Sequence, residues 1–176
     1  MRSKSRKLNR SQYINYTLPG QYFVTLVSKN RLNYFGFIEY DHVVYSEYGQ
    51  IVKNFWNQIP IIHKNVVLGE WIVMPNHIHG VLKIDDPYVG TEHCSVPTTQ
   101  HSVPTNPRSI PTTRVGYGPI SKIIKGFKEA CVKSIRKEYG DYEFGWQRSF
   151  HDHLIRDDLD LKKINIYIRN NVRRHS

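Results

Sequence analysis

Two histidines separated by a single residue, His77 and His79, lie in the segment WIVMPNHIHGVLKI at residues 71–84. The apolar residues around them are typical of a β-strand, in which side chains at i and i+2 point to the same face. Both imidazoles are therefore expected side by side on one face of a strand. Such a pair can serve as two ligands of one metal ion, as a nucleic-acid contact, or as a structural pair inside the protein.

An H-x-H pair is a weak signal in a chain with nine histidines, and the segment FHDHLIR contains a second one, His151 and His153. The first pair differs because it follows the Pro75-Asn76 break at the start of an apolar strand. Side chains at that place are expected to be held rigidly, with one edge open. Rigid imidazoles suit a divalent cation that keeps coordination positions free for substrate oxygens.

The terminal segment INIYIRNN supplies two further candidates, Tyr167 and Asn171. In a helix, residues four apart lie on one face. The amide oxygen of Asn171 is a suitable group for completing a metal site, and the phenol of Tyr167 is a possible nucleophile toward phosphorus. A free tyrosine has a pKa near ~10, so it needs activation, and a metal ion that neutralises the phosphate is one route. The alternative is that Tyr167 is a half-buried core residue, one of twelve tyrosines.

The chain is basic, with 25 Lys and Arg against 15 Asp and Glu and a formal charge of +10. This balance favours an anionic partner, most often nucleic acid. The two cysteines, Cys94 and Cys131, argue against a disulfide scaffold and against a cysteine-rich zinc site. We find no signal peptide and no apolar run of ~18 residues, so we expect a cytoplasmic protein without a membrane span.

The hydrophobic pattern predicts the elements that must position these residues. We expect strands at 21–28, 66–74, 77–84 and 148–156, two more within 36–46, and helices at 47–63, 118–140 and 157–171. Pro60 is expected to disturb the last turn of the first helix. Strand pairs separated by single helices predict an α+β sandwich with a largely antiparallel sheet.

Two regions differ in composition from the rest of a single expected domain that spans residues 1–176. Residues 1–12 form a basic arm, which we expect to contact phosphates. Residues 85–118 are rich in Ser, Thr and Pro and carry three short units, SVPT at 95 and 102 and SIPT at 109. With little to bury, this stretch is predicted to be a disordered or extended insert.

Four segments in this order resemble the REP-associated tyrosine transposases, which are single-tyrosine transposases of the HUH group (His, hydrophobe, His) related to insertion-sequence transposases. The segments are WIVMPNHIHGVL, ISKIIKGFKEA, GWQRSFHDHLIR and INIYIRNN, and GQYFVTLVSKNR is similar to the first strand of the family. The resemblance covers nearly the whole chain outside residues 85–113. It departs at Val172, where the family commonly has proline, and the chain stops at Ser176, soon after this helix.

The resemblance implies a ferredoxin-like α+β sandwich, with an antiparallel sheet and helices packed on it, that cuts and rejoins single-stranded or hairpin DNA in transposition. By it, His77 and His79 match the two metal ligands, and Asn171 matches a third group at the metal site. Tyr167 matches the nucleophile that forms a 5′-phosphotyrosine. The implied metal is Mg²⁺ or Mn²⁺. His153 matches a histidine often found in its strand, with a role left open.

Charge and resemblance together predict DNA contacts from the arm, from the second helix and from the region of the last strand. The predicted residues are Arg2, Lys4, Arg6, Lys7, Lys122, Lys125, Arg148, His153 and Arg156. Two alternatives stay open: a non-catalytic binder of DNA hairpins, and a metal-dependent nuclease that uses water. We expect a monomer or a homodimer in a bacterial cytoplasm.

Overall fold

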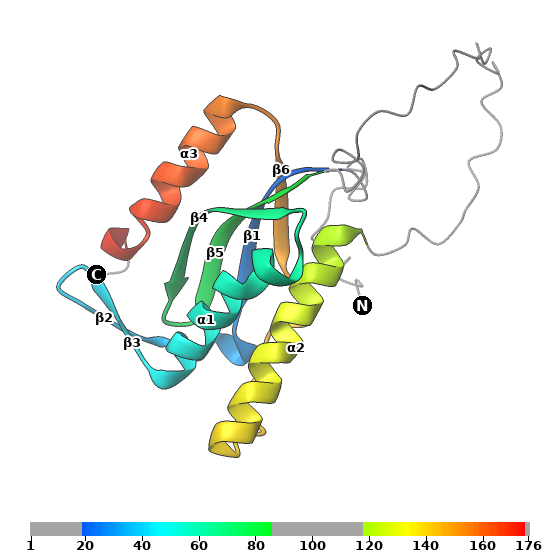
Figure 1. Ribbon diagram of the computed structural model, residues 1–176. Helices are drawn as coiled ribbons and strands as arrows, with labels where there is room; N and C mark the ends of the chain where they lie inside the picture. Colours follow the sequence, from blue (N-terminus) through cyan, green and yellow to red (C-terminus); the bar gives the residue numbers. More distant parts are fainter. Residues whose placement is uncertain (1–18, 86–117, 175–176) are drawn as a thin grey trace, which may run out of the picture.

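Four strands pair into one sheet in the order β4-β5-β1-β6, and every pairing in it is antiparallel (Figure 1). The computed structural model describes residues 19–85 and 118–174, so the basic arm and nearly all of the predicted insert lie outside the described residues. The strands and helices in chain order are β1 (Gly20–Val27), β2 (Gly36–Glu39), β3 (His42–Tyr45), α1 (Glu47–Ile62), β4 (Val66–Met74), β5 (His77–Ile84), α2 (Pro119–Tyr139), β6 (His151–Ile155) and α3 (Asp158–Arg169).

The alternation of side chains along β1 divides the sheet into two faces. Tyr22, Val24 and Leu26 are fully buried on one face. Phe23 and Thr25 lie between them in sequence and therefore point to the other face. We call these the core face and the site face.

Helices α1 and α2 cover the core face and lie side by side over it (Figure 1). Apolar residues recur at helical spacing in the sequence of α2, which predicts one buried stripe. Its members are all buried: Ile120, Ile123, Ile124, Phe127, Cys131 and Ile135. Trp56 of α1 packs against Gly80 of β5, and a Cβ added at Gly80 would lie 2.4 Å from the Trp56 ring. The glycine is thus needed for the close approach of helix and strand.

Helix α3 covers the site face through a much smaller apolar cluster, which Val81, Ile164 and Ile168 form with partly buried neighbours. Asp157 caps the helix, since its carboxylate accepts a hydrogen bond of 2.8 Å from the Asp160 N–H. Polar pairs join both ends of α3 to the sheet: His153–Asp160 near its start and Arg169–Glu70 near its end.

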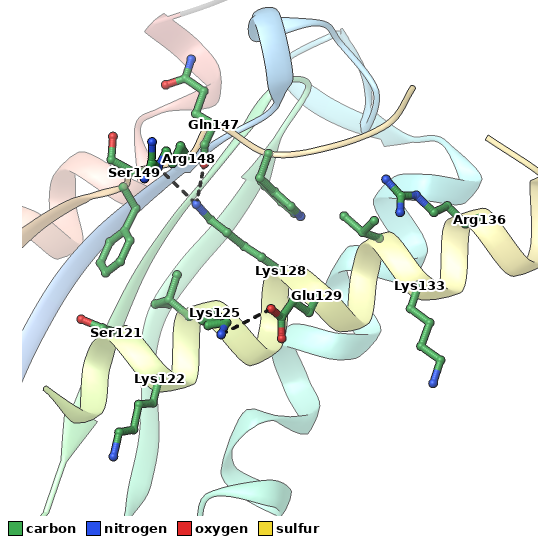
Figure 2. A pocket seen from close by; sticks show the side chains of 14 residues that line it. Ser121, Lys122, Lys125, Lys128, Glu129, Lys133, Arg136, Gln147, Arg148 and Ser149 are labelled. Carbon is green, nitrogen blue, oxygen red and sulfur yellow. Dashed lines mark hydrogen bonds and ion pairs between the residues drawn. The ribbon is translucent and has the colours of Figure 1, made fainter. Parts of the chain in front are cut away.

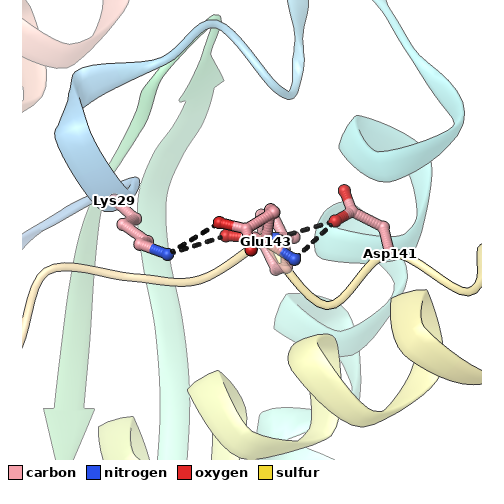
Figure 3. A network of polar contacts seen from close by, with 4 residues as sticks. Lys29, Asp141 and Glu143 are labelled. Carbon is pink, nitrogen blue, oxygen red and sulfur yellow. Dashed lines mark hydrogen bonds and ion pairs between the residues drawn. The ribbon is translucent and has the colours of Figure 1, made fainter.

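The segment between α2 and β6 is held in place by hydrogen bonds rather than by regular structure. The Asp141 carboxylate accepts from the N–H groups of Glu143 and Phe144 at 2.7 and 3.0 Å and from the Tyr48 hydroxyl at 3.0 Å. The N–H groups of Phe144 and Glu143 help to hold the pKa of Asp141 below its usual range. Lys29 pairs with Glu143 at 3.3 Å (Figure 3), so this loop is tied to the end of β1.

Most element ends lie within one residue of the prediction, and three larger differences have a structural cause. Strand β6 begins at His151 rather than at 148, because the carbonyls of Gln147 and Ser149 accept from Lys128 instead of pairing in the sheet. Helix α3 ends at Arg169 rather than at 171, and the Asn171 N–H reaches back only three residues to Ile168.

The third difference lies in α1, which continues through Pro60 to Ile62. A bond of 2.8 Å from the His63 N–H to the Ile59 carbonyl closes the last turn after the proline. The predicted disturbance of that turn was therefore wrong.

Strands β2 and β3 form a separate two-stranded hairpin outside the main sheet.

The fold class is confirmed: the described chain is an α+β sandwich of the ferredoxin-like kind, with an antiparallel sheet and helices packed on it. Within residues 19–85 and 118–174, no helix is both long and apolar enough to span a bilayer.

Candidate active site

The two histidines of the H-x-H motif stand at the start of β5, directly after a two-residue connection from β4. His77 pairs with Met74 across this hairpin. The carbonyls of Pro75 and Asn76 each accept a backbone hydrogen bond of 2.9 Å, from Phe35 and Ser28 respectively. The turn is thus anchored on both sides, and the strand start that carries His77 has a fixed position.

The imidazole of His77 is oriented by Asn76. Its Nδ1 lies 2.7 Å from the Asn76 amide oxygen, and the amide nitrogen of Asn76 donates to the Arg31 carbonyl at 3.2 Å. Because that second bond fixes which end of the amide faces His77, Nδ1 of His77 carries a proton and donates it to the amide oxygen. The other ring nitrogen, Nε2, faces the site.

The imidazole of His79 is almost fully buried, with 5% of the residue exposed. Its Nδ1 lies 2.9 Å from the Thr25 hydroxyl on β1, the residue directly opposite in the sheet. Phe23 stacks on the ring at a centroid distance of 5.4 Å. These contacts leave Nε2 of His79 pointing at Nε2 of His77, 3.1 Å away.

Helix α3 brings Tyr167 to the same point. Ile164 and Ile168 pack on Val81, and the phenolic oxygen of Tyr167 then lies 3.2 Å from Nε2 of His79. Phe23 meets the Tyr167 ring edge-on at 6.1 Å. The structure therefore brings three predicted residues together, although 88 positions of sequence separate His79 from Tyr167.

The nitrogen atoms of this cluster fit a shared metal ion. Two imidazole nitrogens bound at right angles to one ion, at bond lengths of ~2.1 Å, would lie about 3 Å apart, and the two Nε2 atoms are separated by 3.1 Å. In the part of the chain that is described, no three His, Cys, Asp or Glu side chains gather as one metal-binding group. Among the described residues, a third protein ligand would therefore be another kind of side chain, such as an amide.

Asn171, the predicted third group, lies two residues beyond the end of α3 and is fully buried. Its amide oxygen and nitrogen have no hydrogen-bond partner among residues 19–85 and 118–174. A buried amide without partners is costly, which fits a group that is satisfied by a ligand. The described hydrogen bonds do not join it to His77 or His79, and its role as a ligand stays a prediction.

The predicted DNA-contacting residues fall into separate groups. Lys122, Lys125 and Arg148 line one groove beside α2 (Figure 2). His153 lies on the site face and meets Asp160 at 2.7 Å, while Arg156 is exposed just beyond β6. The four arm residues that are predicted to contact DNA lie outside the described residues.

Sequence reasoning missed Thr25, Asn76 and Phe23, which orient the imidazoles and the phenol. Asn76 adjoins the motif, and its polar side chain beside a histidine was an available signal. Thr25 and Phe23 are on another strand, and only the register of β1 against β5 shows that they face His79 and Val81. The register of β1 against β6 places the exposed His151 opposite Thr25, on the site face.

No protein-family model matches the sequence. A solved structure of a REP-associated tyrosine transposase bound to a REP hairpin is similar in fold, with a TM-score of 0.60 over 95% of this chain and 75% of that one. At 16% identity, this likeness shows the fold. An uncharacterized protein of Haemophilus influenzae is 30% identical over 166 residues, which cover 94% of this chain and 87% of that protein. The chain belongs to the same family as this Haemophilus influenzae protein.

Proposed function

We propose that the protein is a DNA strand transferase of the transposase type, which cuts one strand of hairpin-containing DNA and holds the cut end on Tyr167. One observation carries the proposal. The phenolic oxygen of Tyr167 lies 3.2 Å from Nε2 of His79, which itself lies 3.1 Å from Nε2 of His77. A nucleophile beside two converging nitrogen ligands is an arrangement suited to phosphoryl transfer.

Charge and fold support DNA as the substrate. The formal charge of +10 favours a polyanion. The structural neighbour is a REP-associated tyrosine transposase that was solved with a REP hairpin, so a DNA hairpin flanked by single strands is the substrate that we propose here.

In the proposed reaction, the phenolic oxygen of Tyr167 attacks the scissile phosphorus, and the bond from phosphorus to the 3′ oxygen breaks. The phenol gives up its proton, the 3′ oxygen takes one up, and a 5′-phosphotyrosine remains. Because a phosphodiester replaces a phosphodiester, attack by a 3′-hydroxyl can rejoin the strand without ATP. Phe23 restricts the ring of Tyr167, so the nucleophile is held before the substrate arrives.

Nε2 of His77 and Nε2 of His79 would hold a divalent cation, with Asn171 as a third group by family resemblance. When bound, Mg²⁺ or Mn²⁺ polarises the scissile phosphate and offsets the charge that builds up on its oxygens. Asn76 and Thr25 keep both imidazoles aimed at this position through their contacts to Nδ1.

The test incubates the full chain with hairpin-containing single-stranded DNA and Mg²⁺ or Mn²⁺, and looks for a denaturant-resistant adduct. In wild type, the peptide that carries the 5′ phosphate should contain Tyr167. Tyr167→Phe removes one oxygen, so cleavage and adduct should both fall by about a thousandfold or more while hairpin affinity stays the same. Tyr40→Phe, at a 90% exposed tyrosine, is the matched control and should cut normally.

Other outcomes separate the alternatives. Hairpin binding without any cleavage would make the protein a non-catalytic binder. Cleavage without an adduct, unaffected by Tyr167→Phe, would make it a nuclease that uses water. An adduct on another tyrosine would refute the assignment of the nucleophile.

A further inference from the structure

A long groove runs beside α2 at the β6 edge of the sheet, apart from the histidines and Tyr167. Its walls are α2, from Ser121 to Arg136, and the segment from Trp146 to Phe150 that leads into β6 (Figure 2). The cavity volume is about 1290 Å³, more than the ~300–1,000 Å³ of sites for small molecules. The helix wall is about 22 Å long, at ~1.5 Å per residue.

The groove is strongly cationic. Six basic side chains line it: Lys122, Lys125, Lys128, Lys133, Arg136 and Arg148. The one acid among the described lining residues, Glu129, faces Lys125 at 3.8 Å in an exposed pair. The excess of positive charge favours a polyanion over a neutral or cationic occupant.

The floor of the groove is apolar and includes Trp146, Phe150, Val132 and Ile124. A duplex presents phosphates to a protein surface and keeps the faces of its bases stacked inside. Bases of an unpaired strand can instead stack on aromatic side chains while their phosphates meet a basic rim. An apolar floor under a cationic rim therefore fits a single strand better than a duplex.

The role of Lys128 differs from that of the other basic residues, because its ammonium group connects the two walls of the groove. It donates to the carbonyls of Gln147 and Ser149 at 2.9 and 3.4 Å (Figure 2). Burial lowers the pKa of Lys128 to about 8. The far wall is also bound to β1, since the Gln147 N–H donates to the Val27 carbonyl at 2.8 Å. The groove is therefore a preformed feature of the fold.

The groove leads toward the candidate active site. Phe150 is followed directly by His151, which lies on the site face opposite Thr25, and Thr25 in turn lies opposite His79. A single strand of DNA that leaves the groove at Phe150 and passes around β6, which is the edge of the sheet, arrives on the face that holds Tyr167.

We propose that this groove binds the unpaired nucleotides that flank the hairpin, with their phosphates on the rim lysines and a base stacked on Phe150 or Trp146. This inference rests on the proposed function for the identity of DNA as ligand, but the binding it describes needs neither the metal nor Tyr167.

The first test measures binding of dT12, which forms no hairpin, by fluorescence anisotropy to the full chain over a range of salt concentrations. The groove variant carries Lys122→Gln, Lys125→Gln and Lys133→Gln. The control carries Lys64→Gln, Lys162→Gln and Lys163→Gln, three exposed lysines outside the groove with the same loss of charge.

We expect the groove variant to lose at least tenfold in affinity, and the slope of log affinity against log salt to fall by about 2, at ~0.7 per phosphate contact. The control should stay within twofold of wild type. Equal losses in both variants, or a 12-base-pair duplex that binds as tightly as dT12, would overturn the proposal.

The second test examines the stacking contact. Phe150→Leu keeps an apolar side chain and should weaken dT12 binding about fivefold. Because Phe150 packs against the core, ultraviolet crosslinking of wild type to dT12 carrying one 5-iododeoxyuridine gives an independent measurement. Crosslinks should map to residues 146–150, and crosslinks confined to other peptides would refute the inference.

The proposed strand-transferase function and the proposed binding groove can be refuted independently. Normal adduct formation together with wild-type dT12 affinity in the groove variant would refute the groove and leave the strand transferase standing. If the protein forms no adduct and makes no cut, but its dT12 binding depends on the groove lysines, the strand transferase is refuted and the groove proposal stands.

Discussion

The two faces of the sheet are built differently. The core face is closed by α1 and α2 over a large cluster of fully buried side chains that includes Trp56, Leu26 and Ile135. Among the described residues, the site face is covered by α3 alone through three buried residues, Val81, Ile164 and Ile168, and polar pairs join both ends of that helix to the sheet.

Because of this difference, one face mainly stabilises the fold and the other holds the candidate active site. Apolar burial, at about 25 cal/mol per Å², makes the core face the main source of stability. The site face has room for polar side chains, and its imidazoles and phenol find partners in one another, in Thr25 and in Asn76. Substitutions on neighbouring residues of one strand should therefore separate activity from stability.

The largest effect is expected for His77→Ala and His79→Ala. Each removes one of the two converging nitrogens, so DNA cleavage should fall by about a thousandfold or more. Both variants should still unfold cooperatively in urea, since neither ring belongs to the buried apolar clusters. The midpoint should fall more for His79→Ala than for His77→Ala, because His79 is nearly buried and stacks on Phe23. Cleavage is measured on the same hairpin-containing DNA, and unfolding by circular dichroism.

His42→Ala, at an exposed histidine of β3, is the matched control and should keep full activity. Near-normal cleavage by both motif variants would move attention to His151 and His153. Loss of cooperative unfolding in either variant would contradict the division between the two faces.

A smaller effect, now on stability, is expected for Gly80→Ala. The residue follows His79 but points to the core face, where the added methyl group would lie 2.4 Å from the Trp56 ring. Overpacking of this kind costs roughly 1–3 kcal/mol, which we expect in the free energy of unfolding.

The control for this change is Gly126→Ala on α2, where an added Cβ meets nothing within 4 Å. It should stabilise the protein by about 0.5–1 kcal/mol, because alanine favours the helix interior. Cleavage by folded Gly80→Ala protein should stay within tenfold of wild type. A selective loss of activity without destabilisation would show that the two faces are coupled at this position.

The sequence predicted the core face more completely than the site face. The spacing of Ile120, Ile124 and Ile135 was sufficient to assign the buried side of α2, because helical period and burial are local properties. The ends of β6 and α3 were not predictable in this way. They depend on where Lys128 finds carbonyl acceptors and on the backbone bond from Asn171 to Ile168, which are tertiary and capping contacts.

The candidate site was predictable only in part for the same reason. His77 and His79 share a face by the alternation of a strand, which is local. That Tyr167 reaches His79 follows from the packing of α3 on Val81, and that Thr25 supports the imidazole follows from strand register. Pairing across 54 or 88 positions is a property of the fold, not of the spacing of residues.

A further prediction concerns the support of the site rather than its reacting groups. Asn76→Ala removes the acceptor that fixes the His77 ring, so the Mn²⁺ concentration for half-maximal cleavage should rise about tenfold. Asn76→Asp keeps an oxygen acceptor for Nδ1 and should lie closer to wild type. Equal effects of the two substitutions would show that the bond from Asn76 to the Arg31 carbonyl matters more than the bond to His77.

The smallest effect is expected where α3 is tied to β6. The hydrogen bond from His153 to the Asp160 carboxylate is the largest cause that holds the pKa of Asp160 below its usual value of 3.8. A carboxyl group whose pKa is lower in the folded state stabilises the fold above its unfolded pKa, and this contribution is lost as the pH falls through the folded pKa.

Asp160→Asn should therefore lower the thermal midpoint slightly at pH 6, and the difference from wild type should shrink below about pH 4 as the wild-type carboxylate is protonated. Asp158→Asn removes the same charge from the same turn of α3 without a described bond to His153. It is the control, because any general effect of negative charge at a helix start appears in both variants. A difference between Asp160→Asn and wild type that stays constant down to pH 3 would mean that the hydrogen bond, not the charge, stabilises this end of α3. Cleavage should be almost unchanged, since the apolar contacts of Ile164 and Ile168 with Val81 still place Tyr167 beside His79.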